Sequence, residues 1–268
     1  MSWSKLLLLA TFILLIALAR KPQPAKAISG DRFFGAAPSQ DDDQIMVASY
    51  NIQTGKSLEG KRNIQASAAV LADADLAGVQ EVYAAGWFNK FGVGQSQTEV
   101  LAGDHFAYRH HPTRWRWGRT DRGNAILSKL AVKAWHTQPL PDWSNKSFRN
   151  YTVVELEHKG QSFHFMNTHL HTGTGRDQQL ELVLNEFVKY ERAILVGDFN
   201  ANNDHPRLTA LLEQQLAVDA IASLKLDPEE DKRIDWILLR GFTPVSGQYQ
   251  AKGVSDHPFY AVAVKLSQ

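Results

Sequence analysis

Cysteine is absent from this chain of 268 residues. Its absence excludes disulfide bonds, thiolate zinc sites and catalysis by a cysteine nucleophile. It does not indicate a compartment, because chains without cysteine are compatible with oxidising and reducing surroundings alike.

The chain also has no internal repeat, no low-complexity tract and no linker rich in proline, glycine or serine through its middle. With 44% hydrophobic residues, a chain of this length can bury a large core. We therefore predict one catalytic domain over residues 44–268. A connector at 28–43, which ends in an acidic run, is predicted to precede it.

No apolar run reaches the roughly 20 residues that a membrane-spanning helix needs. Lys5 precedes an apolar run at 6–19, which would rise only about 21 Å as a helix. The residues Ala25–Ala27 have the small-x-small form of a signal-peptidase site. Residues 1–27 are thus predicted to be a signal peptide, or an N-terminal membrane anchor if the intervening basic residues and prolines prevent cleavage. Either interpretation predicts an exported protein that is secreted, periplasmic or membrane-anchored.

The chain carries little excess charge, with 29 basic and 28 acidic residues. Residues 1–27 hold four of the basic residues and none of the acidic ones. Without them, 25 basic residues face 28 acidic ones, which is a net charge of about −3. The predicted domain therefore has no global attraction for polyanions, and any such attraction must be local.

Short apolar strands in this sequence end or begin with polar side chains. The run Ile194–Val196 is followed by Gly197, and then Asp198 and Asn200 leave the strand end on the same side. Similar positions are occupied by Asn51 after 45–50, Glu81 after 76–80, His169 after 163–168, Asp235 inside 234–239, and Asp256 with His257 before 259–264. Carboxylate and amide oxygens suit a hard cation or the activation of water.

The strand ends that carry these groups predict the direction of the strands. The early groups follow their strands, whereas Asp235, Asp256 and His257 lie at strand beginnings. If all share one site, the late strands must run opposite to the early ones, so the sheets must be mixed. Helices are predicted at 61–71, 176–189 and 206–216, and Asp204 is predicted to cap the last of them. The alternating pattern at 151–157 predicts a strand with antiparallel pairing and one wetter face.

Asp235 is the most informative single residue. It lies in an otherwise apolar strand, where an unpaired carboxylate costs several kcal/mol. We expect a protonated His257 to offset this cost. The alternative is that Asp235 accepts backbone hydrogen bonds at the start of its strand.

A basic and aromatic stretch at 109–119 interleaves arginines with two tryptophans. Arg114 and Arg116 could bind phosphates while the tryptophans stack on bases or sugars. The alternative is a surface loop whose tryptophans pack against the sheet.

Seven motifs in order resemble the endonuclease/exonuclease/phosphatase superfamily of metal-dependent phosphoesterases. They are Tyr50-Asn51-Ile52, Gln80-Glu81-Val82, Gly123-Asn124-Ala125-Ile126-Leu127-Ser128, Asn167-Thr168-His169-Leu170, Gly197-Asp198-Phe199-Asn200, Ile234-Asp235-Trp236-Ile237 and Ser255-Asp256-His257. The resemblance covers residues 45–265. It implies a four-layer α/β (α+β) sandwich, in which two packed mixed β-sheets are flanked by helices.

The resemblance also implies roles for individual residues. Glu81 would be the principal ligand of Mg²⁺ or Mn²⁺, with Asn51 and Asp256 nearby. Asp198 would orient or deprotonate the attacking water, and Asn200 would hold a phosphate oxygen. His257, paired with Asp235, would stabilise negative charge on the phosphate or act as the base. His169 would contact the phosphate or help to protonate the leaving oxygen. Asn124, with Arg114 and Arg116, is expected to contact substrate.

The resemblance predicts chemistry more closely than it predicts substrate. We expect a monomeric hydrolase that cleaves phosphodiester bonds with Mg²⁺, and a nuclease-type activity on nucleic acid. A phospholipid phosphodiesterase resembling sphingomyelinases, or a phosphatase, is the alternative, and the N-terminal segment could bring such an enzyme to a membrane. A non-catalytic family member that binds a partner in the same cleft is the remaining alternative.

Overall fold

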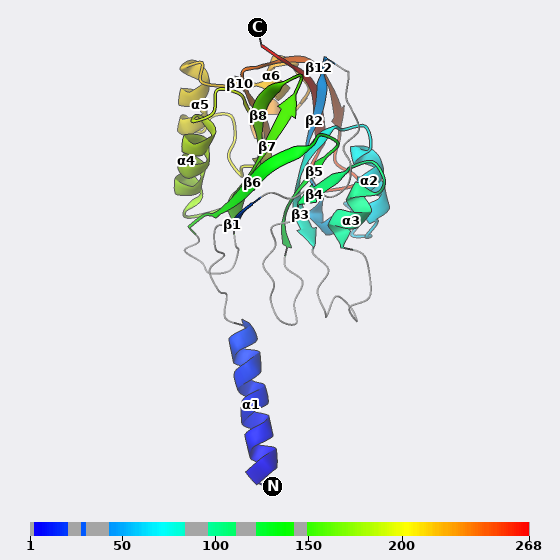
Figure 1. The fold of residues 1–268 in the computed structure, drawn as a ribbon, viewed down its shortest axis with the longest axis vertical. Coiled ribbons are helices and arrows are strands. Elements are labelled where there is room, and N and C mark those ends of the chain that lie inside the picture. Colours follow the sequence, from blue (N-terminus) through cyan, green and yellow to red (C-terminus); the bar gives the residue numbers. More distant parts are fainter. Residues whose placement is uncertain are drawn as a thin grey trace.

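Two packed β-sheets with helices on their outer faces form the main body of the protein (Figure 1). The computed structural model describes residues 3–20, 28–30, 43–83, 96–110, 122–141 and 149–267. Helices α4 (Arg176–Phe187) and α5 (Pro206–Glu213) cover one sheet, and α2 (Ile64–Leu71) and α3 (Gln97–Ala102) cover the other. The predicted four-layer sandwich is confirmed.

The two sheets both mix parallel and antiparallel strands. In spatial order, the seven-stranded sheet contains β1 (Ile28–Gly30), β6 (Val132–Pro139), β7 (Asn150–His158), β8 (Gln161–His169), β9 (Ala193–Asp198), β11 (Asp235–Arg240) and β10 (Val218–Asp219). The six-stranded sheet contains β12 (Phe242–Gln250), β13 (Phe259–Leu266), β2 (Ile45–Asn51), β3 (Leu76–Tyr83), β5 (Arg122–Ser128) and β4 (Tyr108–His110). Only β2 with β3 and β8 with β9 pair in parallel among these strands.

The late strands run as the sequence predicted. Strand β11 is antiparallel to β9, and β13 is antiparallel to β2. The C-terminal ends of β2, β8 and β9 therefore meet the N-terminal ends of β11 and β13 at one edge of the sandwich. This arrangement brings polar groups from both sheets to the same edge.

Most of the buried side chains lie in three apolar layers. The central layer joins the facing sides of the sheets and includes Phe163, Phe165 and Tyr260. The outer layers pack the sheets against α4 and α5 on one side and against α2 and α3 on the other. Between the sheets, a Cβ atom on Gly78 would lie 2.2 Å from Cγ2 of Val196, so the lack of a side chain permits this close approach.

One local prediction held only in part and another was wrong. Strand β7 pairs antiparallel with both neighbours, as predicted, but its wetter face is limited to the half-buried Glu155 and the exposed Glu157. Its other residues are buried, because the facing sheet covers one side of the strand and α4 covers the other. Helix α5 is capped by His205 and not by Asp204, since Nδ1 of His205 accepts from the backbone N–H of Arg207. Strand β12 was not predicted, because its glycine, proline and polar residues hide the pattern of a strand at the sheet edge.

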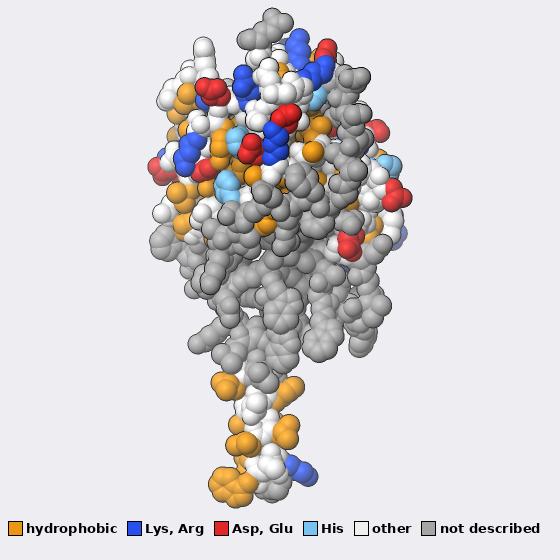
Figure 2. Space-filling model, in the orientation of Figure 1, with side chains coloured by type: hydrophobic (Ala, Val, Ile, Leu, Met, Phe, Trp, Pro, Cys, Tyr) orange, Lys and Arg blue, Asp and Glu red, His pale blue; other side chains and the backbone are white. Residues whose placement is uncertain are grey.

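The N-terminal segment contributes two described elements. Helix α1 (Trp3–Arg20) exposes Trp3, Leu7 and Leu8, and Figure 2 shows its hydrophobic side chains around the helix. None of the helices in the described part of the chain is long and apolar enough to cross a membrane. Within the predicted connector, Ile28–Gly30 forms β1 and pairs antiparallel with β6.

One shorter helix and two 3-10 turns complete the described elements. They are α6 (Ala220–Ser223), η1 (Gln53–Gly55) and η2 (Glu230–Lys232), with the N-terminal end of α6 capped by Asp219. The turn η1 directly follows β2 and lies beside the polar edge of the sandwich.

Candidate active site

Strand register places three polar side chains next to one another. Asp198 is the last residue of β9, and it pairs with Asp235, the first residue of β11. On the other side of β9, the same Asp198 pairs with His169, the last residue of β8. Because adjacent strands lie about 4.8 Å apart, these three side chains meet at the sheet edge.

Asp198 lies at the centre of the site and is only 2% exposed. Its Oδ2 accepts a hydrogen bond from Nδ2 of Asn51 at 3.0 Å. The same oxygen lies 3.2 Å from Nε2 of His169 and 3.7 Å from Nε2 of His257. Its Oδ1 accepts from the backbone N–H of Asn200 at 3.0 Å. One carboxylate is thus held by groups from both sheets.

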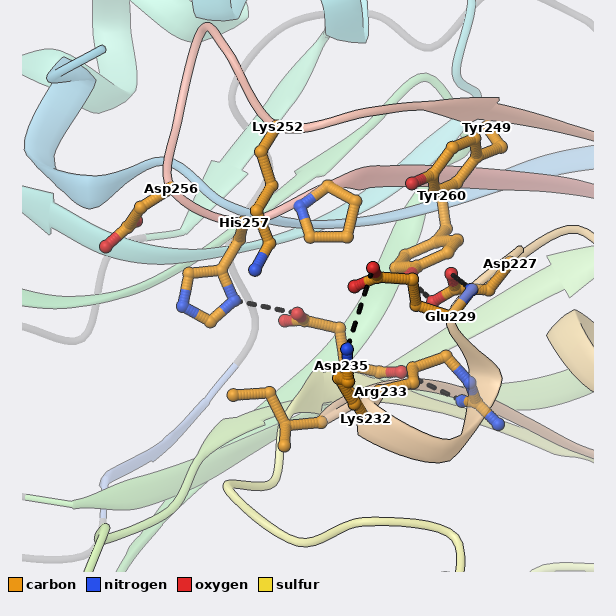
Figure 3. A pocket seen from close by; sticks show the side chains of 12 residues that line it. Asp227, Glu229, Lys232, Arg233, Asp235, Tyr249, Lys252, Asp256, His257 and Tyr260 are labelled. Atoms are coloured by element: carbon orange, nitrogen blue, oxygen red, sulfur yellow. Dashed lines mark hydrogen bonds and ion pairs between the residues drawn. The ribbon is translucent and has the colours of Figure 1, made fainter. Parts of the chain in front are cut away.

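Asp235 and His257 form the contact that the sequence predicted. Nδ1 of His257 lies 2.7 Å from Oδ2 of Asp235, and Figure 3 shows this contact as a dashed line. Asp235 is 2% exposed, so its charge needs a partner. Its backbone oxygen also accepts from Nη1 of Arg233, which is buried and paired with Asp219. These contacts fix the orientation of the imidazole ring.

The buried charges shift the pKa values of Asp198 and His257. Burial raises the pKa of Asp198, and the nearby charge of Asp235 raises it further, against the lowering effects of His257 and Asn51. For His257, burial acts to lower the pKa. The charge and hydrogen bond of Asp235, with the charges of Asp198 and Asp256, outweigh burial and raise the pKa to about 9. At neutral pH the ring therefore carries a proton next to a carboxylate that ionises less readily than usual.

Asn200 is held in a left-handed conformation, with φ of 50°. Its Nδ2 donates to the backbone oxygen of Leu170 at 3.0 Å, and its own carbonyl accepts from Nη1 of Arg176 at 2.7 Å. An amide nitrogen has two N–H groups, so Nδ2 keeps a second donor for a substrate oxygen. The contacts of Asn200 are compatible with its predicted role.

Glu81 reaches the edge through an irregularity in β3. The pairing of β3 with β5 shifts register between Val79 and Val82, and Glu81 has φ of 60°. A bulge of this kind changes the direction of a side chain, and a left-handed non-glycine residue is uncommon. Strand β2 is the parallel neighbour of β3, and its last residue, Asn51, pairs with Gln80 of β3. Glu81, the next residue of β3, therefore lies at the same edge as Asn51.

Gln53 connects two of the predicted metal ligands, and sequence reasoning missed it. Its backbone N–H donates to Oδ1 of Asn51 at 3.1 Å, while its Nε2 donates to Oδ2 of Asp256 at 2.6 Å. Gln53 also has a left-handed φ of 46°. The only signal in the sequence is its position two residues after Asn51.

One group of side chains that could hold a cation consists of Asp198, Asp235 and His257. Their potential ligand atoms all lie within 4.8 Å of one another. Oδ1 of Asp235 is buried and has no hydrogen-bond partner among the described residues. However, Nδ1 of His257 is bonded to Asp235, so a cation bound there would have to displace the proton that this pair shares.

A second group consists of Asn51, Glu81 and Asp256, the predicted ligands. All three offer oxygen, which Mg²⁺ and Mn²⁺ prefer over protonated imidazole. Glu81 and Asp256 are half-buried, so an ion can reach them from solvent. The residues present fit a hard cation, and we favour this group over the first for that chemical reason.

The predicted substrate-binding residues are not brought to this edge by any described contact. Asn124 is buried, and its Nδ2 donates to the backbone oxygen of Asn150 at 3.3 Å, a contact that joins two strands. Arg114 and Arg116 lie outside the described residues. The roles of these three residues in substrate binding stay predictions.

The geometry supports proton transfer and the binding of an anion. Asp198 can accept a proton from water, because a buried carboxylate with a raised pKa is a stronger base than an exposed one. His257 and His169 can donate to oxygens that gain negative charge. Acid, base and oxygen ligands thus meet at one edge, as hydrolysis of an ester requires.

Comparisons with known proteins identify the family and the fold. The sequence model described as "Endonuclease/Exonuclease/phosphatase family" matches residues 48–257. No match to a curated protein was found. Among solved structures, an endonuclease/exonuclease/phosphatase from Beutenbergia cavernae DSM 12333 is 20% identical, with a TM-score of 0.69 over 84% of this chain and 72% of that chain.

Two further solved structures share this fold. TDP2 from D. rerio, complexed with single strand DNA product, is 15% identical, with a TM-score of 0.60 over 84% of this chain and 100% of that chain. The mannosyl-6-phosphatase Bt3783 from Bacteroides thetaiotaomicron VPI-5482 is 18% identical, with a TM-score of 0.59 over 82% of this chain and 99% of that chain. At such identities the similarity shows the fold alone. The match of the family model over residues 48–257 decides the classification: the chain belongs to the endonuclease/exonuclease/phosphatase family.

Proposed function

We propose that this protein is a divalent-metal-dependent phosphoesterase that hydrolyses phosphodiester bonds by attack of water, with a nuclease-type activity. The observation that carries the proposal is the buried series of contacts from Asp235 to His257 and from Asp198 to Asn51 and His169. Members of this family are typically phosphoester hydrolases, which supports a hydrolase here.

The side chains divide the work of hydrolysis among them. Asp198 orients the attacking water and takes its proton. His257 is held by Asp235 and donates to a phosphate oxygen that becomes more negative during attack. His169, 3.2 Å from Asp198, lies where it can contact the phosphate or the leaving oxygen. Asn200 and Asn51 hold further oxygens.

A divalent cation held by Glu81, Asp256 and Asn51 would supply a Lewis acid that offsets negative charge on the phosphate. Gln53 supports this ligand group, because it donates to both Asn51 and Asp256. We propose Mg²⁺ or Mn²⁺, on the grounds that all three ligands are oxygen donors.

Nucleic acid is the substrate that we propose, and a phosphomonoester is the second candidate. One structure with this fold holds a single-strand DNA product, and another is described as a sugar phosphatase. Both chemistries need the same catalytic groups. A phospholipid substrate stays an alternative, whereas a purely binding role is disfavoured by the complete set of polar groups at the site.

A substrate panel with Mg²⁺ tests this proposal. It contains plasmid DNA, RNA, sphingomyelin, phosphoinositides, a sugar monophosphate and a generic phosphodiester. Asp198→Asn is the inactive control, because it keeps the shape of the side chain and removes the base. Cleavage of DNA or RNA that Asp198→Asn abolishes supports the proposal. Cleavage of only the monoester or only the lipid would overturn nucleic acid as the substrate and keep the phosphoesterase activity. Absence of cleavage of every member of the panel would overturn the proposed function.

We also propose that the N-terminal segment directs export. Its support is the basic residue, the apolar run and the small-x-small site at Ala25–Ala27. Fractionation of cells that express the full chain, followed by N-terminal sequencing of the recovered protein, tests whether residues 1–27 are removed.

A further inference from the structure

A pocket of about 160 Å³ adjoins the Asp235–His257 pair. Figure 3 shows it bounded by the hairpin loop between β12 and β13 and by the segment that contains η2. Tyr249, Pro258 and Ile234 contribute apolar atoms to its lining. Ligand pockets for whole small molecules are typically about 300–1,000 Å³, so this pocket has the size of a subsite for one part of a substrate.

Most charged groups of the pocket already have partners. Asp227 accepts from the hydroxyl of Tyr260, and Glu229 lies 3.7 Å from Nζ of Lys232. The two acids shared with the active site, Asp235 and Asp256, are bonded to His257 and Gln53 respectively. The guanidinium of Arg233 contacts Asp219, outside the pocket.

Lys252 differs from these groups. It lines the pocket, and its ammonium has no ion pair or hydrogen bond within the described parts of the chain. In Figure 3 its side chain extends from the hairpin loop towards the Asp235–His257 pair. The pocket therefore presents one unpaired positive charge beside the predicted reaction centre.

The loop that carries Lys252 is held in place on both sides. The backbone N–H of Gly253 donates to the carbonyl of Ser255 at 2.8 Å, and the carbonyl of Gly253 accepts from Leu58 at 3.1 Å. The same loop supplies Asp256 and His257. Lys252 is thus attached to the backbone that positions two site residues, so the start of its side chain is fixed relative to Asp256 and His257.

We propose that this pocket is a subsite for a second anionic group of the substrate, and that Lys252 is the specificity-determining residue that binds it. The proposal rests on the proposed function and narrows it to phosphoesters that carry another phosphate about one sugar unit from the scissile bond. The neighbouring phosphate of a nucleic acid strand and the second phosphate of a small sugar bisphosphate share this chemistry. The apolar wall formed by Tyr249 and Pro258 suits the sugar between them.

Matched substrates that differ by one phosphate test the proposal. The first pair is the thymidine dinucleotide TpT with and without a 5′-phosphate, and the second is a hexose 1,6-bisphosphate with the hexose 6-phosphate. The ratio of kcat/KM within each pair is measured with Mg²⁺ for the wild-type protein, Lys252→Met and Lys252→Arg. Lys265→Met is the control, because Lys265 is an exposed lysine at the far end of β13.

The wild-type protein is expected to prefer the member with the extra phosphate in at least one pair. Lys252→Met should reduce that preference about tenfold or more, since a charge-assisted hydrogen bond is lost, while Lys252→Arg should keep part of it. Lys265→Met should keep all of it. The pair that responds identifies the source of the second phosphate.

Binding to Asp198→Asn gives a readout without turnover. The dissociation constants of both TpT forms are measured for Asp198→Asn alone and combined with Lys252→Met, and thermal unfolding checks that both proteins are folded. A preference that Lys252→Met leaves unchanged, or an equal loss on both members of a pair, overturns the subsite proposal although hydrolysis persists. Absence of hydrolysis of every phosphoester overturns the proposed function itself.

Discussion

The two sheets contribute to the active site in different ways. The seven-stranded sheet supplies His169, Asp198 and Asp235, which are 2–5% exposed. The six-stranded sheet and its hairpin loop supply the half-buried Glu81, Asp256 and His257, with Asn51 the buried exception. Deep burial shifts the pKa of a carboxylate and fixes its geometry, whereas partial exposure admits a cation and a substrate. Under the proposed function, the seven-stranded sheet would hold the base, and the six-stranded sheet with its hairpin loop would bind the metal.

The largest expected effect comes from removing the cation from the group formed by Glu81, Asp256 and Asn51. EDTA should lower turnover on the order of 10³-fold or more, because the charge on the phosphate is then no longer offset by a Lewis acid. Added Mg²⁺ or Mn²⁺ should restore it. Glu81→Gln should move the metal-dependence curve to higher concentration, and the exposed Glu213→Gln on α5 should not. Full turnover in the presence of chelator would show that the residues from the six-stranded sheet do not bind a cation that hydrolysis requires.

The Asp235–His257 pair joins the seven-stranded sheet to the hairpin loop of the six-stranded sheet, and the two residues should act in catalysis as one unit. Asp235→Asn and His257→Ala should each lower kcat on the order of 10²-fold, and the double variant should be little worse than either. The reason is that the carboxylate acts mainly through the ring that it holds, at 2.7 Å. Steady-state kinetics of the four proteins check this. Losses that multiply in the double variant would mean that the two residues act separately.

The same pair predicts a change in proton affinity that does not depend on catalysis. The charge and hydrogen bond of Asp235 raise the pKa of His257 to about 9, so Asp235→Asn should lower that pKa by about one unit or more. NMR titration of the ring in EDTA measures it. Because the folded pKa lies above the ordinary 6.5, protonation of His257 stabilises the fold at low pH, and this contribution is lost as pH rises from about 6.5 to about 9. An unchanged titration would remove the electrostatic argument for the pair.

The close contact between the sheets gives a smaller effect, on stability. Gly78→Ala should reduce the free energy of unfolding by about 1–3 kcal/mol, because its Cβ would lie 2.2 Å from Val196 and 2.9 Å from Asn167. Gly253→Ala is the matched control, since no heavy atom lies within 4 Å of the added Cβ. Denaturant unfolding compares the two variants. Equal stabilities would show that the sheets can separate at Gly78 without cost.

The smallest effect is expected at the N-terminus. A chain that starts at residue 40 should be soluble and keep its activity, because the first buried strand, β2, begins at Ile45. It loses β1, which is only three residues at the edge of the seven-stranded sheet. Solubility, circular dichroism and turnover of the shortened protein measure this. Unfolding of the shortened chain would mean that residues 1–39 stabilise the sandwich.

The sequence alone was sufficient to predict the strands that carry the site, their relative directions and the contact between Asp235 and His257. Apolar runs and the polar residues at their ends are local patterns, so they can be read without knowing the rest of the chain. An acid inside an apolar strand requires a partner wherever the strand lies, and this made Asp235 informative. The wetter face predicted for β7 is confined to Glu155 and Glu157, because burial depends on which layers cover a strand.

Only the tertiary structure decided how the site is assembled around Asp198. The bulge that turns Glu81, the amide of Gln53 between Asn51 and Asp256, and the pocket beside Lys252 depend on register and on residues far apart in the chain. Gln53 and Asp256 are 203 positions apart, and no local pattern relates them. Strand propensity specifies which segments pair, but the direction of a side chain at a strand end depends on bulges, left-handed residues and the packing of the second sheet.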